Sequence, residues 1–293
     1  MLPLEAVPNF SEGREQGTID ALGAALGAQA RLLDVHADVD HNRSVFTLVG
    51  NEAELVEALV AGVLCAIERI DLRRQEGAHP RVGAADVVPV VPLRPEELER
   101  AKAAALKVAE VIGDEVGVPV FLYGELASDR GPAFFRRGGL DELRRRVEAG
   151  ELVPAYGPRR LDSAAGAVLV GARRPLIAFN VNLRGSLPAA RAIAEQVRER
   201  GAGFPGVRAL GLDLPSAGLV QVSMNVEDYE AAALHDIVAR IGEEAARCGV
   251  EVVGSELVGL MPAAAVAAAA GALLGIDGFD ATRVLELRLL EQG

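Results

Sequence analysis

The same order of strands and helices is predicted twice along the chain, and this repetition restricts the fold more than any other feature. Alternating apolar residues predict strands, and apolar residues three and four positions apart predict amphipathic helices. Both halves follow the order βαββαβ, and the first half has an extra helix and strand. In the first half we predict strands at 4–10, 32–37, 44–49, 87–92 and 119–123 and helices at 18–28, 52–69 and from 96. In the second half we predict strands at 176–181, 207–214, 220–225 and 251–254 and helices at 188–200, 228–248 and onward to the end.

This order predicts an α+β fold of two similar ferredoxin-like βαββαβ lobes, each an open sheet with helices on one face. Segment 150–166 contains proline and glycine and is predicted to lead out of the first lobe. Two sheets in one chain can face each other across a cleft, and ligands commonly bind where domains meet. We therefore expect residues from both halves to reach one ligand.

The composition restricts the class of protein. The net charge of −12 argues against nucleic-acid binding, which requires a basic face. The longest apolar run, near 262–274, is too short to span a membrane, which takes about 20 residues. No basic and apolar leader is present at the start, so we expect a cytoplasmic protein. Cys65 and Cys248 lie in helical patterns far apart and are predicted to be core residues.

A loop around His79 is the strongest candidate for chemistry. Pro80 disfavours a helical conformation for His79, and Gly77 and Gly83 allow a ligand close approach. Asp86 follows in the same segment and is a candidate to orient the imidazole or support the loop. We predict that His79 is catalytic, with a structural role as the alternative.

Arginines are the candidates for binding an anionic ligand. A guanidinium binds a carboxylate through two parallel hydrogen bonds, and an acidic protein must supply that charge locally. Five arginines lie beside predicted strand ends or glycine-rich turns, where each either binds a carboxylate or is a surface charge: Arg14, Arg43, Arg81, Arg173 and Arg184.

Segment 36–43 follows an apolar strand and has two interpretations. It partly matches the His-x-His-x-Asp-His pattern of metallo-β-lactamase-like hydrolases, but Asp38 occupies the position of the second histidine. In the other interpretation Asp38 and Asp40 form an Asx turn, and His36, Asn42 and Arg43 face a substrate.

Motifs along almost the whole chain resemble the formiminotransferase domain of the formiminotransferase-cyclodeaminase family. They lie at 7–14, 32–36, 41–50, 79–91, 119–124, 171–173, 176–183, 221–225 and 254–260. The resemblance implies two similar α/β lobes with a substrate tunnel between their sheets. It also implies an N-terminal subdomain over 1–173 and a C-terminal subdomain over 174–293, and it suggests a homodimer.

The activity that the resemblance implies is transfer of the formimino group from N-formimino-L-glutamate to N5 of tetrahydrofolate in histidine breakdown. Tetrahydrofolate is then a co-substrate, and no metal is required. The family histidine falls on His79, as the base that accepts the N5 proton. Six other residues are predicted to bind substrate: Asn9, His36, Arg43, Arg81, Asn180 and Arg184.

The chain departs from the family in two places. His36 stands where the animal enzymes carry an acidic residue, and no cyclodeaminase region follows the transferase motifs. Three alternatives remain: a related transfer between 5-formyltetrahydrofolate and glutamate, a metal-dependent hydrolase that uses His36, Asp38, Asp40 and His41, and a folate-binding protein without turnover.

Overall fold

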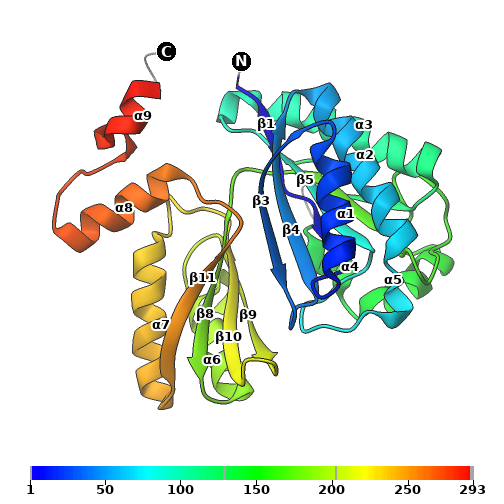
Figure 1. Ribbon diagram of the computed structural model, residues 1–293. Helices are drawn as coiled ribbons and strands as arrows, with labels where there is room; N and C mark the ends of the chain where they lie inside the picture. The colour runs from blue at the N-terminus through cyan, green and yellow to red at the C-terminus, as the bar shows by residue number, and fades with distance from the viewer. Residues whose placement is uncertain (1, 128–129, 202, 291–293) are drawn as a thin grey trace. The chain divides into compact units, whose positions relative to one another are not determined.

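The computed structural model describes residues 2–127, 130–201 and 203–290, which fall into two compact units, 1–174 and 175–293 (Figure 1). Each unit contains its own β-sheet and its own hydrophobic core. The chain is therefore a mixed α+β protein with two sheets, as the sequence predicts.

The first unit is built on a seven-stranded sheet. Two central strands, β4 and β5, pair antiparallel with β1 and β2, while β7 pairs parallel to both β5 and β6. The edge strand β3 pairs with β4. The strands are β1 (Leu4–Ala6), β2 (Asn9–Phe10), β3 (Arg31–Asp38), β4 (Arg43–Gly50), β5 (Ala85–Val91), β6 (Val120–Gly124) and β7 (Val168–Ala172). The single strand predicted at 4–10 is thus divided in two around Pro8, which has no backbone N–H to donate.

Helices cover both faces of this sheet, but unequally. On one face α1 (Gln16–Gly27), α2 (Glu52–Arg69) and α3 (Leu98–Val111) pack over the largest apolar cluster. On the other face α4 (Pro132–Arg136) and α5 (Gly139–Glu148) pack against alternate residues of β5, β6 and β7. The sequence predicts neither α4, α5 nor β7. Short helical turns lie at Leu72–Arg74 (η1), Pro95–Glu97 (η2) and Ile112–Val116 (η3).

Segment 150–166 does not lead out of the first unit, contrary to the prediction. It connects α5 to β7 and supports the loop that carries His79. Gly83 and Gly166 form an antiparallel bridge, and the Ala84 N–H donates to the Ala165 carbonyl at 2.9 Å. Proline and glycine mark an internal loop in the same way as a linker, so composition alone does not separate the two.

The second unit is a four-stranded antiparallel sheet with the βαββαβ order. Its strands lie in the order β11 (Glu251–Val258), β8 (Ile177–Arg184), β10 (Leu219–Val226) and β9 (Val207–Leu214). The helices α6 (Leu187–Val197) and α7 (Leu234–Cys248) pack on one face, where Ile193 and Ile237 are fully buried. The opposite face takes the alternate side chains of the strands, including Asn180 and Gln221.

The end of the chain continues with α8 (Ala263–Leu274), η5 (Ala281–Arg283) and α9 (Leu285–Leu290). Among the helices described, none combines the length and the apolar composition that a membrane-spanning segment requires. Cys65 packs against the first core, but Cys248 is exposed at the end of α7, so its prediction as a core residue is wrong. A helical pattern does not fix which face the last residue of a helix takes.

Candidate functional site

Three loops meet at one end of the first unit's sheet, and together they are called here the three-loop junction. The loop 11–15 follows β2, the turn 39–42 joins β3 to β4, and the loop 75–84 precedes β5. Because β4 and β5 run antiparallel to β2, these loops come to the same end of the sheet. The Ala78 N–H donates to the Asp40 carbonyl at 2.9 Å, and the Ser11 hydroxyl donates to the Gly83 carbonyl at 2.7 Å.

The Asn42 side chain is the centre of this junction. Its Oδ1 accepts from the Gly13 N–H at 2.9 Å, and its Nδ2 donates to Gln75 Oε1 at 2.5 Å. Gln75 in turn donates to Glu12 Oε2 at 2.9 Å. Asn42 has a positive φ of 47°, a conformation that asparagine tolerates better than most residues. The sequence pattern does not single out Gln75 and Glu12, because their role depends on loops far apart in the chain.

Glycines allow the loops to approach this closely. A Cβ atom on Gly13 would lie 2.2 Å from the Asp38 carbonyl oxygen, and one on Gly77 would lie 2.3 Å from the His41 carbonyl oxygen. At Gly83 the corresponding distance to the Ala167 carbonyl oxygen is 2.0 Å. All three contacts are far inside van der Waals separation and involve backbone, so any larger residue displaces a loop.

Arg81 fixes the turn between β3 and β4. Its Nη1 donates to the Asn42 carbonyl at 2.8 Å, and its Nη2 donates to the His41 carbonyl at 2.5 Å. The Asp38 carboxylate accepts from the His41 N–H at 2.6 Å, so this side chain caps the turn, although the bond reaches three residues on and not the two of an Asx turn. The guanidinium of Arg81 is therefore engaged with backbone in this structure.

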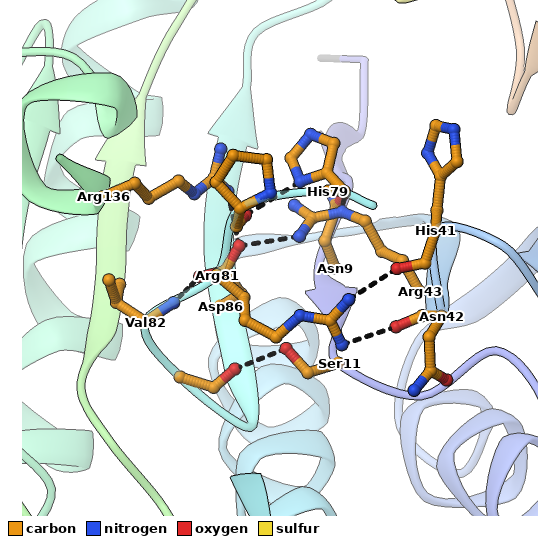
Figure 2. A network of polar contacts seen from close by, with 12 residues as sticks. Asn9, Ser11, His41, Asn42, Arg43, His79, Arg81, Val82, Asp86 and Arg136 are labelled. Carbon is orange, nitrogen blue, oxygen red and sulfur yellow. Dashed lines mark hydrogen bonds and ion pairs between the residues drawn. The ribbon is translucent and has the colours of Figure 1, made fainter. Parts of the chain in front are cut away.

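His79 lies beside the junction with its Nδ1 directed at the Pro80 carbonyl oxygen (Figure 2). Its Nδ1 lies 2.8 Å from the Pro80 carbonyl oxygen, and its ring stacks on His41 with centroids 5.9 Å apart. A carbonyl oxygen only accepts, so we assign the proton of the neutral imidazole to Nδ1. Nε2 then carries the lone pair, as a general base requires.

A β-bulge directs Asp86 toward the same place. Phe10 pairs with Ala85 and Asn9 pairs with Val87, so Asp86 is the additional residue between them. A bulge changes the direction of a side chain, and the carboxylate of Asp86 lies on the side of the arginines with no exposed surface. Strand alternation alone does not predict this orientation.

Two arginines from distant parts of the chain share the Asp86 carboxylate (Figure 2). Arg43 Nη1 and Arg136 Nη2 donate to the same oxygen, Oδ2, at 2.7 and 2.5 Å. The other oxygen, Oδ1, accepts from the Val82 N–H at 2.8 Å, and Arg43 Nε donates to Asn9 Oδ1 at 2.9 Å. Arg136 comes from α4, and the sequence analysis missed it.

Burial and charge together set the protonation states. Burial lowers the pKa of His79 well below its ordinary value; Arg43 and Arg136 lower it further, while Asp86 opposes them. Burial acts to raise the pKa of Asp86, but Arg136 and Arg43 outweigh it and hold that pKa well below its usual range. Burial lowers the pKa of Arg43 to about 10, which leaves it charged at neutral pH. The site thus combines a neutral imidazole with a charged arginine–aspartate cluster.

The other predicted residues lie elsewhere. His36 lies on β3 opposite Val45. Asn180 and Arg184 both belong to β8 in the second unit, where Asn180 is buried and Arg184 is exposed in an ion pair with Glu251. The structure therefore brings Asn9, Arg43, His79 and Arg81 together in the first unit.

The second unit has a polar cluster of its own on the sheet face opposite its helices. Asn180 Nδ2 donates to Glu256 Oε2 at 3.0 Å, and Gln221 Nε2 donates to Asn182 Oδ1 at 2.9 Å. Gln221 also lies 3.4 Å from Glu256 Oε2. Asn180 pairs directly with Glu256 across the strands, and a register of this kind cannot be read from sequence spacing.

No three side chains of histidine, cysteine, aspartate or glutamate are grouped so that they could hold a metal ion in the described ranges 2–127, 130–201 and 203–290. This holds for segment 36–43, in which Asp38 caps the turn.

Comparison with known proteins identifies the family over nearly the whole chain. The formiminotransferase domain, N-terminal subdomain, matches residues 3–173, and the formiminotransferase domain matches residues 178–275. Among solved structures, a microcompartment protein from Desulfitobacterium hafniense aligns over 88% of this chain and 94% of its own. The TM-score of 0.23 and the identity of 12% are too low to indicate a shared fold.

Matches to individual proteins agree with the domain matches. A glutamate formimidoyltransferase of Streptococcus pyogenes is 39% identical over 98% of both chains, and one of Thermoplasma acidophilum is 36% identical over 98% of this chain and 97% of its own. A formimidoyltransferase-cyclodeaminase of Sus scrofa is 39% identical over 91% of this chain, which spans 51% of that longer protein. These matches, together with a histidine loop that the whole junction supports, show that the chain belongs to the formiminotransferase domain family.

Proposed function

We propose that this protein transfers the formimino group from N-formimino-L-glutamate to N5 of tetrahydrofolate, giving 5-formiminotetrahydrofolate and glutamate, as a step of histidine degradation. Support comes from a relative named glutamate formimidoyltransferase that is 39% identical over 98% of both chains. Tetrahydrofolate is the co-substrate, and the reaction as written has no step that requires a metal.

The observation that carries the mechanism is the 2.8 Å contact between His79 Nδ1 and the Pro80 carbonyl oxygen. With Nδ1–H directed to the Pro80 carbonyl, Nε2 is the basic nitrogen. As the N5 amine attacks the formimino carbon, its proton passes to His79 Nε2. When the tetrahedral centre collapses, the bond from that carbon to the glutamate nitrogen breaks and this nitrogen takes the proton. The imidazole ends neutral, and general base catalysis of this kind contributes typically 10²–10⁴-fold.

Holding the two substrates together supplies the rest of the acceleration. Attack of one bound molecule on another gains several kcal/mol when both are positioned. We assign substrate binding to Asn9 and Arg43 beside His79, to His36 and Arg81 near the turn between β3 and β4, and to Asn180 and Arg184 in the second unit. In this proposal the N-terminal subdomain 1–173 and the C-terminal subdomain 174–293 are ferredoxin-like lobes whose sheets face a common substrate tunnel.

Both units contain a βαββαβ element with the same strand order, which supports this proposal. In the first unit the order is β3, β4, the pair β1 and β2, and β5; in the second it is β9, β10, β8 and β11. We further propose that the protein works in the cytoplasm as a homodimer.

The test is a spectrophotometric assay of purified protein with tetrahydrofolate and N-formimino-L-glutamate, followed as the acid-generated 5,10-methenyl product. Wild-type protein should turn over, and His79→Ala should lose about 10²–10⁴-fold in kcat while remaining folded. A parallel reaction with 5-formyltetrahydrofolate and glutamate identifies the alternative donor. Turnover of a folded His79→Ala variant at the wild-type rate would show that His79 is not the base.

A further inference from the structure

The surroundings of His79 are positively charged in a protein of net charge −12. The charged groups that shift the pKa of His79 are the guanidiniums of Arg43 and Arg136 and the carboxylate of Asp86. Two positive charges therefore lie beside one negative charge next to the imidazole. An excess of this kind attracts an anion to the site.

The excess is concentrated at Asp86. Its Oδ2 accepts from Arg43 and from Arg136, so one carboxylate oxygen holds two guanidiniums close to each other. Each guanidinium has five N–H donors. Arg43 uses its Nε and Nη1, and Arg136 uses its Nη2 on Asp86. A second carboxylate placed between them would neutralise the remaining charge.

Arg136 is short of acceptors as it stands. Its side chain is 14% exposed, and its Nε is buried without a hydrogen-bond partner in the described part of the chain. A buried donor left unsatisfied costs about 1–3 kcal/mol, so a site that keeps one needs a reason. An arriving carboxylate that draws the guanidinium toward itself would provide it.

The position of Arg136 is fixed by its neighbour in the chain. Phe135 is 1% exposed and packs on Phe121 with ring centroids 5.2 Å apart, which anchors α4 on the sheet. Arg136 is thereby held against Asp86, whereas Arg137, the next residue, is exposed. The anchor pre-organises the guanidinium and lowers the entropy cost of binding.

We propose that Arg136 and Arg43 together bind one carboxylate of a substrate beside His79. This proposal rests on the proposed function, in which the glutamate portion of the donor and the glutamate tail of the folate both supply carboxylates. The chemistry recognised is the same in each, and a binding experiment separates the two sources.

The experiment compares Arg136→Gln with Arg137→Gln, which removes the same charge from the adjacent exposed position. Calorimetric titration with L-glutamate and, separately, with folate and with pteroate, which lacks the glutamate tail, measures binding without turnover. Arg136→Gln should weaken either L-glutamate or folate by at least tenfold and leave pteroate unchanged, and Arg137→Gln should match wild type. The ligand that weakens identifies the source of the carboxylate.

A pH profile separates a role in the site from a purely structural role. Loss of the Arg136 charge raises the pKa of His79, so the acid limb of kcat/KM should move to higher pH in Arg136→Gln.

If Arg136→Gln does not fold, Arg136→Lys takes its place in the binding experiment. Lysine keeps the charge but lacks the planar pair of donors, so the same ligand should bind several-fold more weakly. Wild-type affinity for both ligands in a folded variant would overturn the proposal, even if the transfer assay succeeds. If wild type binds and Arg136→Gln does not, the proposal stands even where that assay fails.

Discussion

At the scale of the residue, Asp86 shows how a buried charge depends on its partners. It is fully buried, and its carboxylate is shared by Arg43 and Arg136. Removing the charge leaves two buried guanidiniums without a counter-charge, so Asp86→Asn should lower the free energy of unfolding by about 3–5 kcal/mol at pH 7. Asp71→Asn is the control, because Asp71 pairs with Arg73 at the surface, where solvent screens the charges and the pair contributes little to stability. Urea unfolding of both variants measures the difference.

The difference in the free energy of unfolding between wild type and Asp86→Asn should depend on pH, with a sign that follows from the pKa of Asp86. The pKa of Asp86 is lowered in the folded state because Arg136 and Arg43 outweigh the effect of burial. Its contribution to stability is therefore complete above the unfolded pKa, about 3.9, and is lost as the pH falls below that value. The difference in the free energy of unfolding between wild type and Asp86→Asn should decrease below about pH 4. A difference that does not change with pH would mean that Asp86 does not stabilise the protein through its charge.

At the scale of the element, the three-loop junction depends on close backbone contacts. Gly13→Ala places a methyl group 2.2 Å from the Asp38 carbonyl oxygen and 2.5 Å from the Arg43 backbone nitrogen. The turn between β3 and β4 must move, and overpacking of this kind costs about 1–3 kcal/mol or more. We expect Gly13→Ala to be destabilised by at least that amount and to lose activity, measured by thermal unfolding and by the transfer assay.

Gly242→Ala is the matched control for this change. Gly242 lies inside α7, and a Cβ there meets nothing within 4 Å. Alanine is favoured over glycine in a helix by about 1 kcal/mol, so this variant should be slightly more stable than wild type. Equal effects at both positions would mean that the close approach at Gly13 is not what the junction requires.

The length of an element and the regularity of its apolar pattern decide whether the sequence predicts it. α2 is predicted with its observed ends because it is long, amphipathic and begins at the capping box of Asn51 and Glu54. β7 is a short apolar run without alternation, and the short helix α4 has too few turns for a periodicity to be recognised. The sequence predicts His79 and Arg43 because they lie in polar loops next to strands. It does not predict Arg136 or the orientation of Asp86, because these depend on α4 and on a bulge.

At the scale of the whole molecule, each unit has a polar cluster outside its hydrophobic core. His79 lies in the first unit, and the cluster of Asn180, Gln221 and Glu256 lies in the second. Polar side chains in buried positions cost stability unless they are paired, so proteins tend to keep them where they have a function. A reaction between two substrates gives each cluster a ligand to bind. We therefore expect both units to contribute to the same transfer.

Asn180→Ala tests this expectation in the full-length protein. If Asn180 binds a substrate, the variant should lose at least tenfold in kcat/KM, while the pH at which His79 titrates should stay unchanged because the base itself is intact. Its cost in stability should be about 1 kcal/mol, the value for one lost hydrogen bond. Arg208→Gln is the control, because Arg208 forms exposed ion pairs with Glu199 and Glu227 in the same unit. If Asn180→Ala keeps the wild-type kcat/KM while His79→Ala is inactive, Asn180 takes no part in the transfer and the assignment of the β8 cluster to substrate binding fails.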